Sequence, residues 1–184
     1  MCGRYLIDDE ADSAMCLGVL IGEVFPTNIA PVFNHSGMVA ALWGFPHWKS
    51  SGVIINARAE TASQKNMFRK PLISERCVVP SSGFYEWSRG SGRKKKDKYL
   101  LRLPEENFLF MAGMIDVFTD AHGTEYSAFV ILTTSASASV AQIHDRMPVI
   151  LSPEERDAWI GDSGFMEHVL HRPGPELAAQ IIPS

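Results

Sequence analysis

The strongest constraint on the fold is a series of short apolar runs in the middle of the chain, each bounded by turn-forming residues. The runs are rich in β-branched and aromatic residues and are too short for typical helices, so they predict β-strands. They lie at residues 38–43, 52–55, 76–79, 84–87, 99–103, 108–114, 126–133 and 149–151. A chain with this pattern folds mainly as β-sheet.

Glycine-containing turns are expected to join some of these runs into hairpins. Arg89–Gly92 and Asp120–Gly123 each separate two β-type runs, and glycine tolerates the positive φ that such turns require. The turns therefore predict antiparallel neighbours in the sheet.

Helical patterns are fewer and shorter. They lie at residues 61–70, closed by Pro71, at 135–143, and at 152–160, where Ser152 and Pro153 form a typical helix start. We therefore expect an α+β fold, mainly antiparallel β, with a sheet that curls into a barrel and a few short peripheral helices.

Length and composition favour one domain over residues 1–184. The chain is 46% hydrophobic and 21% charged, which is typical of a globular domain, and no repeat or linker divides it. Every apolar stretch is shorter than the roughly 20 residues of a membrane helix, and the chain opens without a secretory pattern. We expect a cytoplasmic monomer without a membrane partner, associated with the nucleoid if its source is bacterial.

Charge is unevenly distributed along the chain. The formal net charge is -4, and it arises from residues 152–184, which we interpret as a helical, acidic C-terminal segment. A basic run near the predicted hairpin either contacts phosphate or merely solvates the hairpin tip. The run comprises Arg89, Arg93, Lys94, Lys95, Lys96 and Lys98.

The three cysteines, Cys2, Cys16 and Cys77, form no C-x-x-C pair. They therefore indicate neither a disulfide framework nor a zinc site, and they fit a reducing compartment. Because the chain also has no glycine-rich phosphate loop, we expect no metal and no nucleotide cofactor.

Cys2 combines two nucleophiles if Met1 is removed, because a terminal cysteine carries a thiol and a free α-amine. The pKa of an α-amine is about 7.7 to 8.0, so part of it is neutral at physiological pH and can attack an aldehyde. The adjacent thiol can then close a five-membered thiazolidine ring. Behind a retained methionine, Cys2 would instead be inert.

Asn56 and Arg58 share one face of an extended segment that follows an apolar run. An amide can orient a polar ligand, and a guanidinium can bind an anion. Taken alone, the pair favours a structural role, with Glu60 and Thr61 starting the next helix.

Glu86 is a carboxylate within the aromatic run Gly83–Trp87. Burial there raises the pKa of a carboxyl group and makes it a candidate proton carrier. Phe84 and Trp87 offer flat faces on which unpaired bases could stack, or they simply pack in the core.

His144 lies in the polar run Ile143–Pro148, just before the last predicted strand. An imidazole exchanges protons near neutral pH, and Arg146, two residues later, is suited to binding phosphate. The run is denser in polar groups than the edge of a core needs, so it indicates a second candidate proton carrier beside an anion site.

Taken in order, these segments resemble the SRAP family, the SOS-response-associated peptidase-like proteins. The resemblance covers residues 1–151. It rests on Met1–Tyr5, Asn28–Pro31, Trp43–Trp48, Asn56–Thr61, Arg76–Pro80, Gly83–Trp87, Ala112–Met114, Thr133–Thr134 and Ile143–Pro148.

The resemblance implies a compact β-rich domain with a positively charged groove for single-stranded DNA that carries an abasic site. It implies that Cys2 attacks the sugar aldehyde and closes a thiazolidine DNA–protein crosslink, in the response to DNA damage. Asn56 would orient the sugar and the amine, and Glu86 and His144 would carry protons. The remaining implied residues are Arg4, Arg58 and Arg146 at phosphates and Trp43 and Trp87 at the groove.

Two other functions fit the same residues. Cys2, Glu86 and His144 could form a thiol peptidase or an autoprotease that removes Met1. Alternatively, the chain is a DNA-binding module without chemistry. A peptidase turns over, a crosslinker is consumed by its substrate, and a binding module keeps its salt-sensitive affinity after Cys2→Ala.

Overall fold

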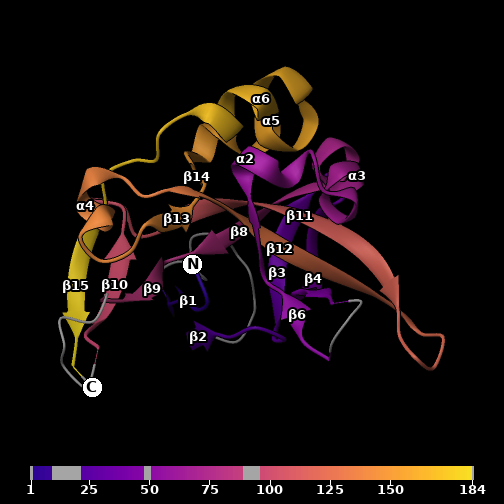
Figure 1. Ribbon diagram of the computed structural model, residues 1–184, viewed down its shortest axis with the longest axis horizontal. Helices are drawn as coiled ribbons and strands as arrows, with labels where there is room; N and C mark the ends of the chain where they lie inside the picture. Colours follow the sequence, from indigo (N-terminus) through magenta and orange to yellow (C-terminus); the bar gives the residue numbers. More distant parts are fainter. Residues whose placement is uncertain (1, 10–21, 48–50, 89–95, 184) are drawn as a thin grey trace.

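Five strands close into a barrel at the centre of the molecule. The computed structural model describes residues 2–9, 22–47, 51–88 and 96–183 (Figure 1). The barrel closes because β12 pairs with β11 on one side and with β4 on the other. Its strands are β3 (Ile29–Asn34), β4 (Gly37–Trp43), β8 (Arg76–Ser81), β11 (Leu109–Thr119) and β12 (Glu125–Ser135).

All pairings in the barrel are antiparallel except that of β12 with β4. The mainly antiparallel, barrel-like α+β fold expected from the sequence is thus confirmed. Three short strands extend the barrel sheet: β7 (Asn56–Arg58) and β13 (Arg146–Pro148) pair with β12, and β14 (Ile150–Leu151) pairs with β11.

A second sheet carries the first described residues. Its strands follow the order β15, β10, β9, β1, β2. Their bounds are Ala178–Ile182, Lys98–Arg102, Gly83–Trp87, Tyr5–Ile7 and Gly22–Val24. A two-stranded ribbon of β5 (Phe45–Pro46) and β6 (Val53–Ile54) precedes β7.

Successive side chains along the long strands belong alternately to two buried clusters. On β12, Phe129 and Ile131 point to the barrel interior, whereas Ala128, Val130 and Leu132 belong to the cluster on the outer face. This is the period of two expected for a strand that is buried on both faces.

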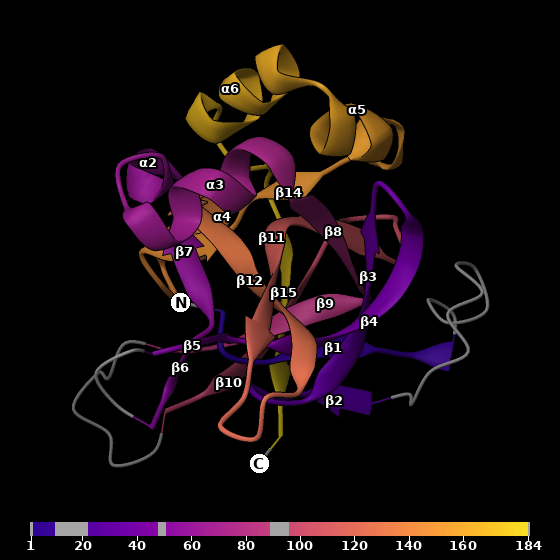
Figure 2. The same cartoon turned by 90° about the vertical axis from the view of Figure 1, so that its right-hand side faces the viewer.

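Helices cover the outer cluster (Figure 2). Trp159 is fully buried there, and its indole N–H donates to the Cys77 carbonyl at 2.9 Å. The covering helices are α2 (Ala59–Ala62), α3 (Asn66–Ser74), α5 (Arg156–Gly161) and α6 (Ser163–His171), whereas α4 (Ala138–Ala141) lies beside β13. No helix in the described part of the chain is long and apolar enough to cross a membrane.

Each of the predicted β-type runs overlaps a strand, and the hairpin at Asp120–Gly123 is confirmed. Gly123 there has φ of +83°, which side chains rarely tolerate. The turn predicted at Arg89–Gly92 lies outside the described residues. The sequence pattern did not indicate the short strands β1, β2, β5, β7 and β13, nor β3 and β15.

Two helix predictions were wrong in their bounds. Residues 61–70 form no single helix, and Pro71 lies inside α3 rather than ending it. Burial of Phe68, Pro71 and Leu72 against the sheet outweighs the one hydrogen bond that proline removes. In the predicted helix at 135–143, only α4 is helical, because Ser135 still pairs with Arg146.

The helix predicted at 152–160 is confirmed as a 3-10 turn at Pro153–Glu155 that leads into α5. Ser152 and Glu155 form a capping box at its start. The segment 152–184 is helical only to His171, however. Pro173 and Pro175 cannot continue a helix, and the chain then forms β15 against β10.

Candidate functional site

Strand pairing brings Cys2 beside Glu86. Tyr5 on β1 lies opposite Phe84 on β9, and the Tyr85 N–H donates to the Arg4 carbonyl at 2.9 Å. Because the two strands are antiparallel, the residues before Tyr5 lie beside the residues after Phe84. This places Cys2 close to Glu86. On the other side of β9, Gly83 allows β10 to lie close, because a Cβ there would lie 2.7 Å from the Leu101 carbonyl oxygen.

Asn56 reaches Cys2 from the barrel sheet. It starts β7, opposite Ile131 on β12, and its side-chain N–H donates to the Cys2 carbonyl at 2.8 Å. Its other polar atom, Oδ1, is buried and has no hydrogen-bond partner among the described residues. That acceptor can serve a ligand's donor.

The Cys2 thiol lies in a site that disfavours its ionisation. Cys2 is fully buried, and its Sγ lies 3.8 Å from the Arg4 carbonyl oxygen. Burial raises the pKa of the thiol, and the negative charge of Glu86 raises it further. The thiol therefore stays protonated at neutral pH.

Glu86 is only 4% exposed. Burial raises the pKa of its carboxyl group, and the charge of Asp145 adds to this effect. The group thus keeps its proton at higher pH than an exposed carboxyl group does and can donate it. The influence of Asp145 also indicates that the His144 segment lies near Glu86.

His144 follows helix α4, and its backbone N–H donates to the Val140 carbonyl at 2.9 Å. Its Nδ1 accepts the Arg146 backbone N–H at 3.0 Å, and an Asp145 carboxylate oxygen lies 3.0 Å from the same atom. With about a quarter of its side chain exposed, the ring can exchange protons with solvent.

The three arginines of the predicted phosphate site differ in their surroundings. The Arg4 guanidinium binds Glu23 at 2.9 Å and lies over the rings of Phe25 and Trp87. Arg146 makes two bonds to Glu60, at 2.6 and 2.9 Å. Arg58 is exposed on β7. Arg4 and Arg146 thus pair with carboxylates, which a phosphate would have to replace.

Trp43 and Trp87 occupy different environments. Trp43 is fully buried between Tyr5 and Phe129, and its indole N–H donates to the Ile55 carbonyl at 3.1 Å. It therefore offers no face to a base and instead supports the residue that precedes Asn56. Trp87 is partly exposed beneath Arg4.

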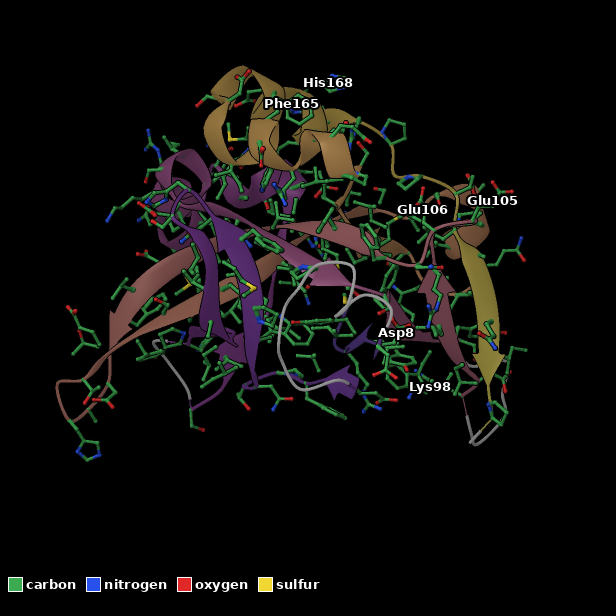
Figure 3. All side chains as sticks on the ribbon, turned by 180° about the vertical axis from the view of Figure 1, so that it is seen from behind. Asp8, Lys98, Glu105, Glu106, Phe165 and His168 are labelled. Atoms are coloured by element: carbon green, nitrogen blue, oxygen red, sulfur yellow. The ribbon has the colours of Figure 1, made fainter. Side chains whose placement is uncertain are left out.

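The roles of Glu23 and Glu60 as partners of these cations were not predicted from the sequence. Glu23 binds both Arg4 and Lys98, and despite partial burial these cations lower the pKa of its carboxyl group. Nothing near Glu23 in the sequence signals this role, whereas Glu60 lies within the Asn56–Thr61 motif. Seen from behind, Asp8 and Lys98 lie below α6, which carries Phe165 and His168 (Figure 3).

Of the predicted basic run, only Lys96 and Lys98 fall within the described residues. Lys96 is exposed, whereas Lys98 forms the ion pair with Glu23. No cluster of three or more histidine, cysteine or acidic side chains in the described ranges could hold a metal ion.

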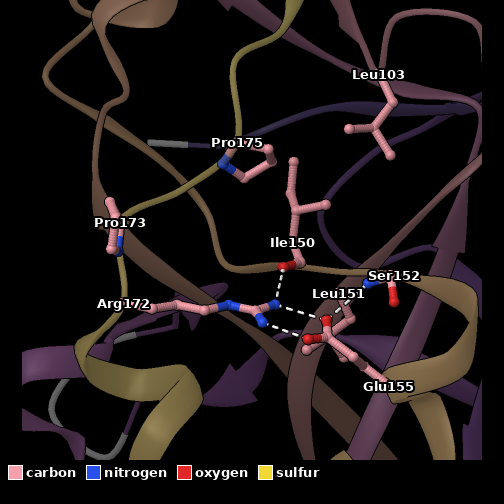
Figure 4. A pocket seen from close by; sticks show the side chains of 8 residues that line it. All are labelled: Leu103, Ile150, Leu151, Ser152, Glu155, Arg172, Pro173 and Pro175. Carbon is pink, nitrogen blue, oxygen red and sulfur yellow. Dashed lines mark hydrogen bonds and ion pairs between the residues drawn. The ribbon is translucent and has the colours of Figure 1, made fainter.

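Two cavities differ in their relation to the site. One, of about 630 Å³, is lined by Asn56 and by the start of α3. The other, of about 350 Å³, lies between β14 and the segment after α6 (Figure 4). In the second cavity Arg172 binds Glu155 and the Ile150 carbonyl, so the charged groups that line this cavity already pair with each other.

Comparison with known proteins shows matches over nearly the whole chain. The model of the SOS response associated peptidase (SRAP) family matches residues 1–180. The abasic site processing protein YoqW of Bacillus subtilis is 34% identical over 194 residues, which cover 92% of this chain and 86% of YoqW. The abasic site processing protein YedK of Escherichia coli is 33% identical over 69% of this chain and 56% of YedK.

Solved structures share the fold. A protein from Bacteroides thetaiotaomicron superposes with a TM-score of 0.84 at 24% identity, covering 99% of this chain and 92% of that one. A protein from Bordetella bronchiseptica gives 0.84 at 21% identity over the full length of both chains.

Proposed function

The chain belongs to the SOS response associated peptidase family, and from that premise we propose that it processes abasic sites in single-stranded DNA by covalent attachment through Cys2. Its relatives YoqW and YedK are abasic site processing proteins, which supports an abasic site as the substrate. The observation that carries the chemistry is the convergence of Asn56 and Glu86 on Cys2 from two different sheets.

The proposed reaction is a condensation of Cys2 with the ring-opened abasic sugar. Removal of residue 1 frees the α-amine of Cys2, which attacks the sugar aldehyde. Loss of one water gives an imine, a Schiff base. The Cys2 sulfur then adds to the imine carbon while its proton passes to the nitrogen, and the thiazolidine ring closes.

The surrounding side chains have distinct roles in these steps. Asn56 already donates to the Cys2 carbonyl, so it orients the cysteine, and its free Oδ1 can accept from a hydroxyl group of the sugar. Glu86, whose pKa is raised by burial, donates a proton to the departing hydroxyl group. His144 moves protons between the site and solvent.

DNA binding is assigned to the cations around this centre. Arg4, Arg58 and Arg146 hold phosphates on either side of the lesion, and the partly exposed Trp87 offers a surface to a base. All these groups belong to one chain, which supports action as a monomer.

The environment of Cys2 favours the crosslink over a thiol peptidase. A peptidase needs a thiolate, which forms readily where neighbouring cations lower the pKa of the thiol. Burial and Glu86 raise the pKa of the Cys2 thiol instead. Addition to an imine suits this environment, because the thiol delivers its proton to the nitrogen in the same step.

Intact mass spectrometry tests the proposal. The purified protein is measured before and after incubation with a single-stranded oligonucleotide that carries one abasic site. We expect that the protein without Met1 gains the mass of the oligonucleotide less one water, and that this adduct survives denaturation.

Two variants distinguish the role of the Cys2 amine from the role of its thiol. Cys2→Ala keeps the amine, so it forms an adduct only when borohydride traps the imine. A variant that retains Met1 has no free amine on Cys2 and cannot close the thiazolidine, so it forms no adduct that survives denaturation without borohydride. Absence of an adduct from wild-type protein that has lost Met1 would overturn the proposal.

A further inference from the structure

The side chain of Asn56 links the cavity of about 630 Å³ to Cys2. Asn56 belongs to both places, because it lines the cavity and donates to the Cys2 carbonyl at 2.8 Å. The volume is in the range of sites for small organic molecules. A group attached to a sugar at Cys2 can therefore reach this cavity.

The lining of the cavity combines amides with an apolar floor. Gln64 and Asn66 are exposed at its mouth, and each offers both a donor and an acceptor. Met67 is half-buried, and Phe68 is buried beneath them. Primary amides match the donor and acceptor edges of nucleobases, and apolar or aromatic side chains match their faces.

The charge of the lining also suits DNA. Lys65 lies at the mouth, with its ammonium group 6.0 Å from the centre of the Phe68 ring. No acidic residue is among the residues that line the cavity. A phosphodiester that passes the mouth therefore meets the cation of Lys65.

We propose that this cavity holds the nucleobase of the nucleotide next to the abasic residue, on one side of the lesion. This inference rests on the proposed function. The abasic residue has no base of its own, and the phosphodiester linkage keeps the neighbouring base within one nucleotide of Cys2. Gln64 and Asn66 contact its edge, and the half-buried Met67 contacts its face, above the buried Phe68.

Binding measurements on unreactive DNA test the inference without the crosslinking chemistry. The oligonucleotides carry a tetrahydrofuran spacer, which has no aldehyde, at the lesion position. In one series a second base-free spacer replaces the nucleotide on the 5′ side, and in another it replaces the nucleotide on the 3′ side. Fluorescence anisotropy gives the Kd of each for the wild-type protein.

We expect the second spacer to weaken binding about fivefold or more on one side of the lesion only, because stacking and edge contacts of one base are lost. In the double variant Gln64→Ala, Asn66→Ala, this difference shrinks, while affinity for the oligonucleotide with the base-free neighbour stays unchanged. Gln180→Ala, an exposed amide on β15, serves as the matched control and keeps the full difference.

The outcomes distinguish the two proposals. Equal affinities for all oligonucleotides, together with normal crosslinking, overturn the base site and leave the proposed function intact. A base effect that survives in the double variant also overturns the assignment to this cavity. Absence of any binding to single-stranded DNA overturns the proposed function and the base site together.

Discussion

Cys2 is surrounded by groups that control its position and its proton. Asn56 holds its backbone through a hydrogen bond of 2.8 Å, whereas burial and Glu86 keep its thiol neutral. These effects act on different atoms of one residue. Loss of Asn56 should therefore disturb geometry, and loss of the Glu86 carboxyl group should disturb proton transfer.

Replacing Glu86 by Gln should change both the pH dependence of stability and the reaction rate. Burial raises the pKa of Glu86 above its ordinary value of 4.5, so the folded protein binds this proton more tightly than the unfolded chain does. Its contribution to the free energy of unfolding is therefore fully present below pH 4.5 and is lost as pH rises through the raised pKa.

Urea unfolding of the wild type and Glu86→Gln across this pH window measures the effect. We expect the wild type to lose more stability than the variant as pH rises. Because Gln cannot donate an acidic proton, we also expect the variant to crosslink about 100-fold more slowly at neutral pH. Parallel stability curves for the two proteins would contradict the assigned pKa direction.

At the scale of elements, one buried side chain joins the ends of two helices. Arg76 is 3% exposed, and its guanidinium donates to the Leu72 and Ile73 carbonyls at the end of α3. It also donates to the Trp159 and Ile160 carbonyls at the end of α5. These carbonyls have no partners within their own helices, and a cation is favourable at a helix C-terminus.

Arg76→Met should destabilise the fold strongly. The apolar side chain fills similar space but leaves buried carbonyl oxygens without donors. We expect the free energy of unfolding to fall by about 3 kcal/mol, measured by urea denaturation. The control is Arg69→Met on the exposed side of α3, which should change stability little. Equal losses for both variants would show that the carbonyl contacts do not matter.

The C-terminal segment reaches the candidate site through α4. The Glu176 carboxylate accepts the backbone N–H groups of Ala138 at 3.2 Å and Ser139 at 2.7 Å, at the start of the helix that precedes His144. Glu176→Ala removes both acceptors, so the helix and His144 lose part of their support.

For Glu176→Ala we expect crosslinking to slow about tenfold, because small displacements of a proton carrier are costly. DNA affinity should not change. Single-turnover rates and Kd values separate these effects, with the exposed Glu106→Ala as control (Figure 3). A parallel loss of affinity would assign Glu176 to DNA binding instead.

For the whole molecule, the barrel determines which distant segments meet. Long strand β12 pairs at different points along its length with β11, β4, β7 and β13. It thereby brings Asn56 and Arg146 to the same region of the sheet. The acidic segment that lowers the net charge to -4 packs its helices on the outer cluster instead.

Salt dependence tests how many phosphates this surface contacts. If Arg4, Arg58 and Arg146 each neutralise one phosphate, the slope of log Kobs against log salt for single-stranded DNA should be about −2. Arg58→Ala should make the slope shallower by about 0.7, whereas Arg156→Ala, on α5, should leave it unchanged. A slope unaffected by Arg58→Ala would remove that residue from the interface.

Local sequence determined the features that depend on chain neighbours. The runs predicted as strands, the Asp120–Gly123 hairpin and the helix start at Ser152 follow from side-chain alternation, turn geometry and capping, which act over a few residues. The motif residues likewise identified candidate chemistry from their types alone.

Tertiary structure decided the features that depend on distant partners. The hydrogen bond from Asn56 to Cys2 spans 54 positions, and the bonds from Arg146 to Glu60 span 86. Burial of Trp43 and the pairing of β15 with β10 likewise depend on how the sheets close. Such contacts arise from strand register and packing between remote segments, which no local pattern encodes.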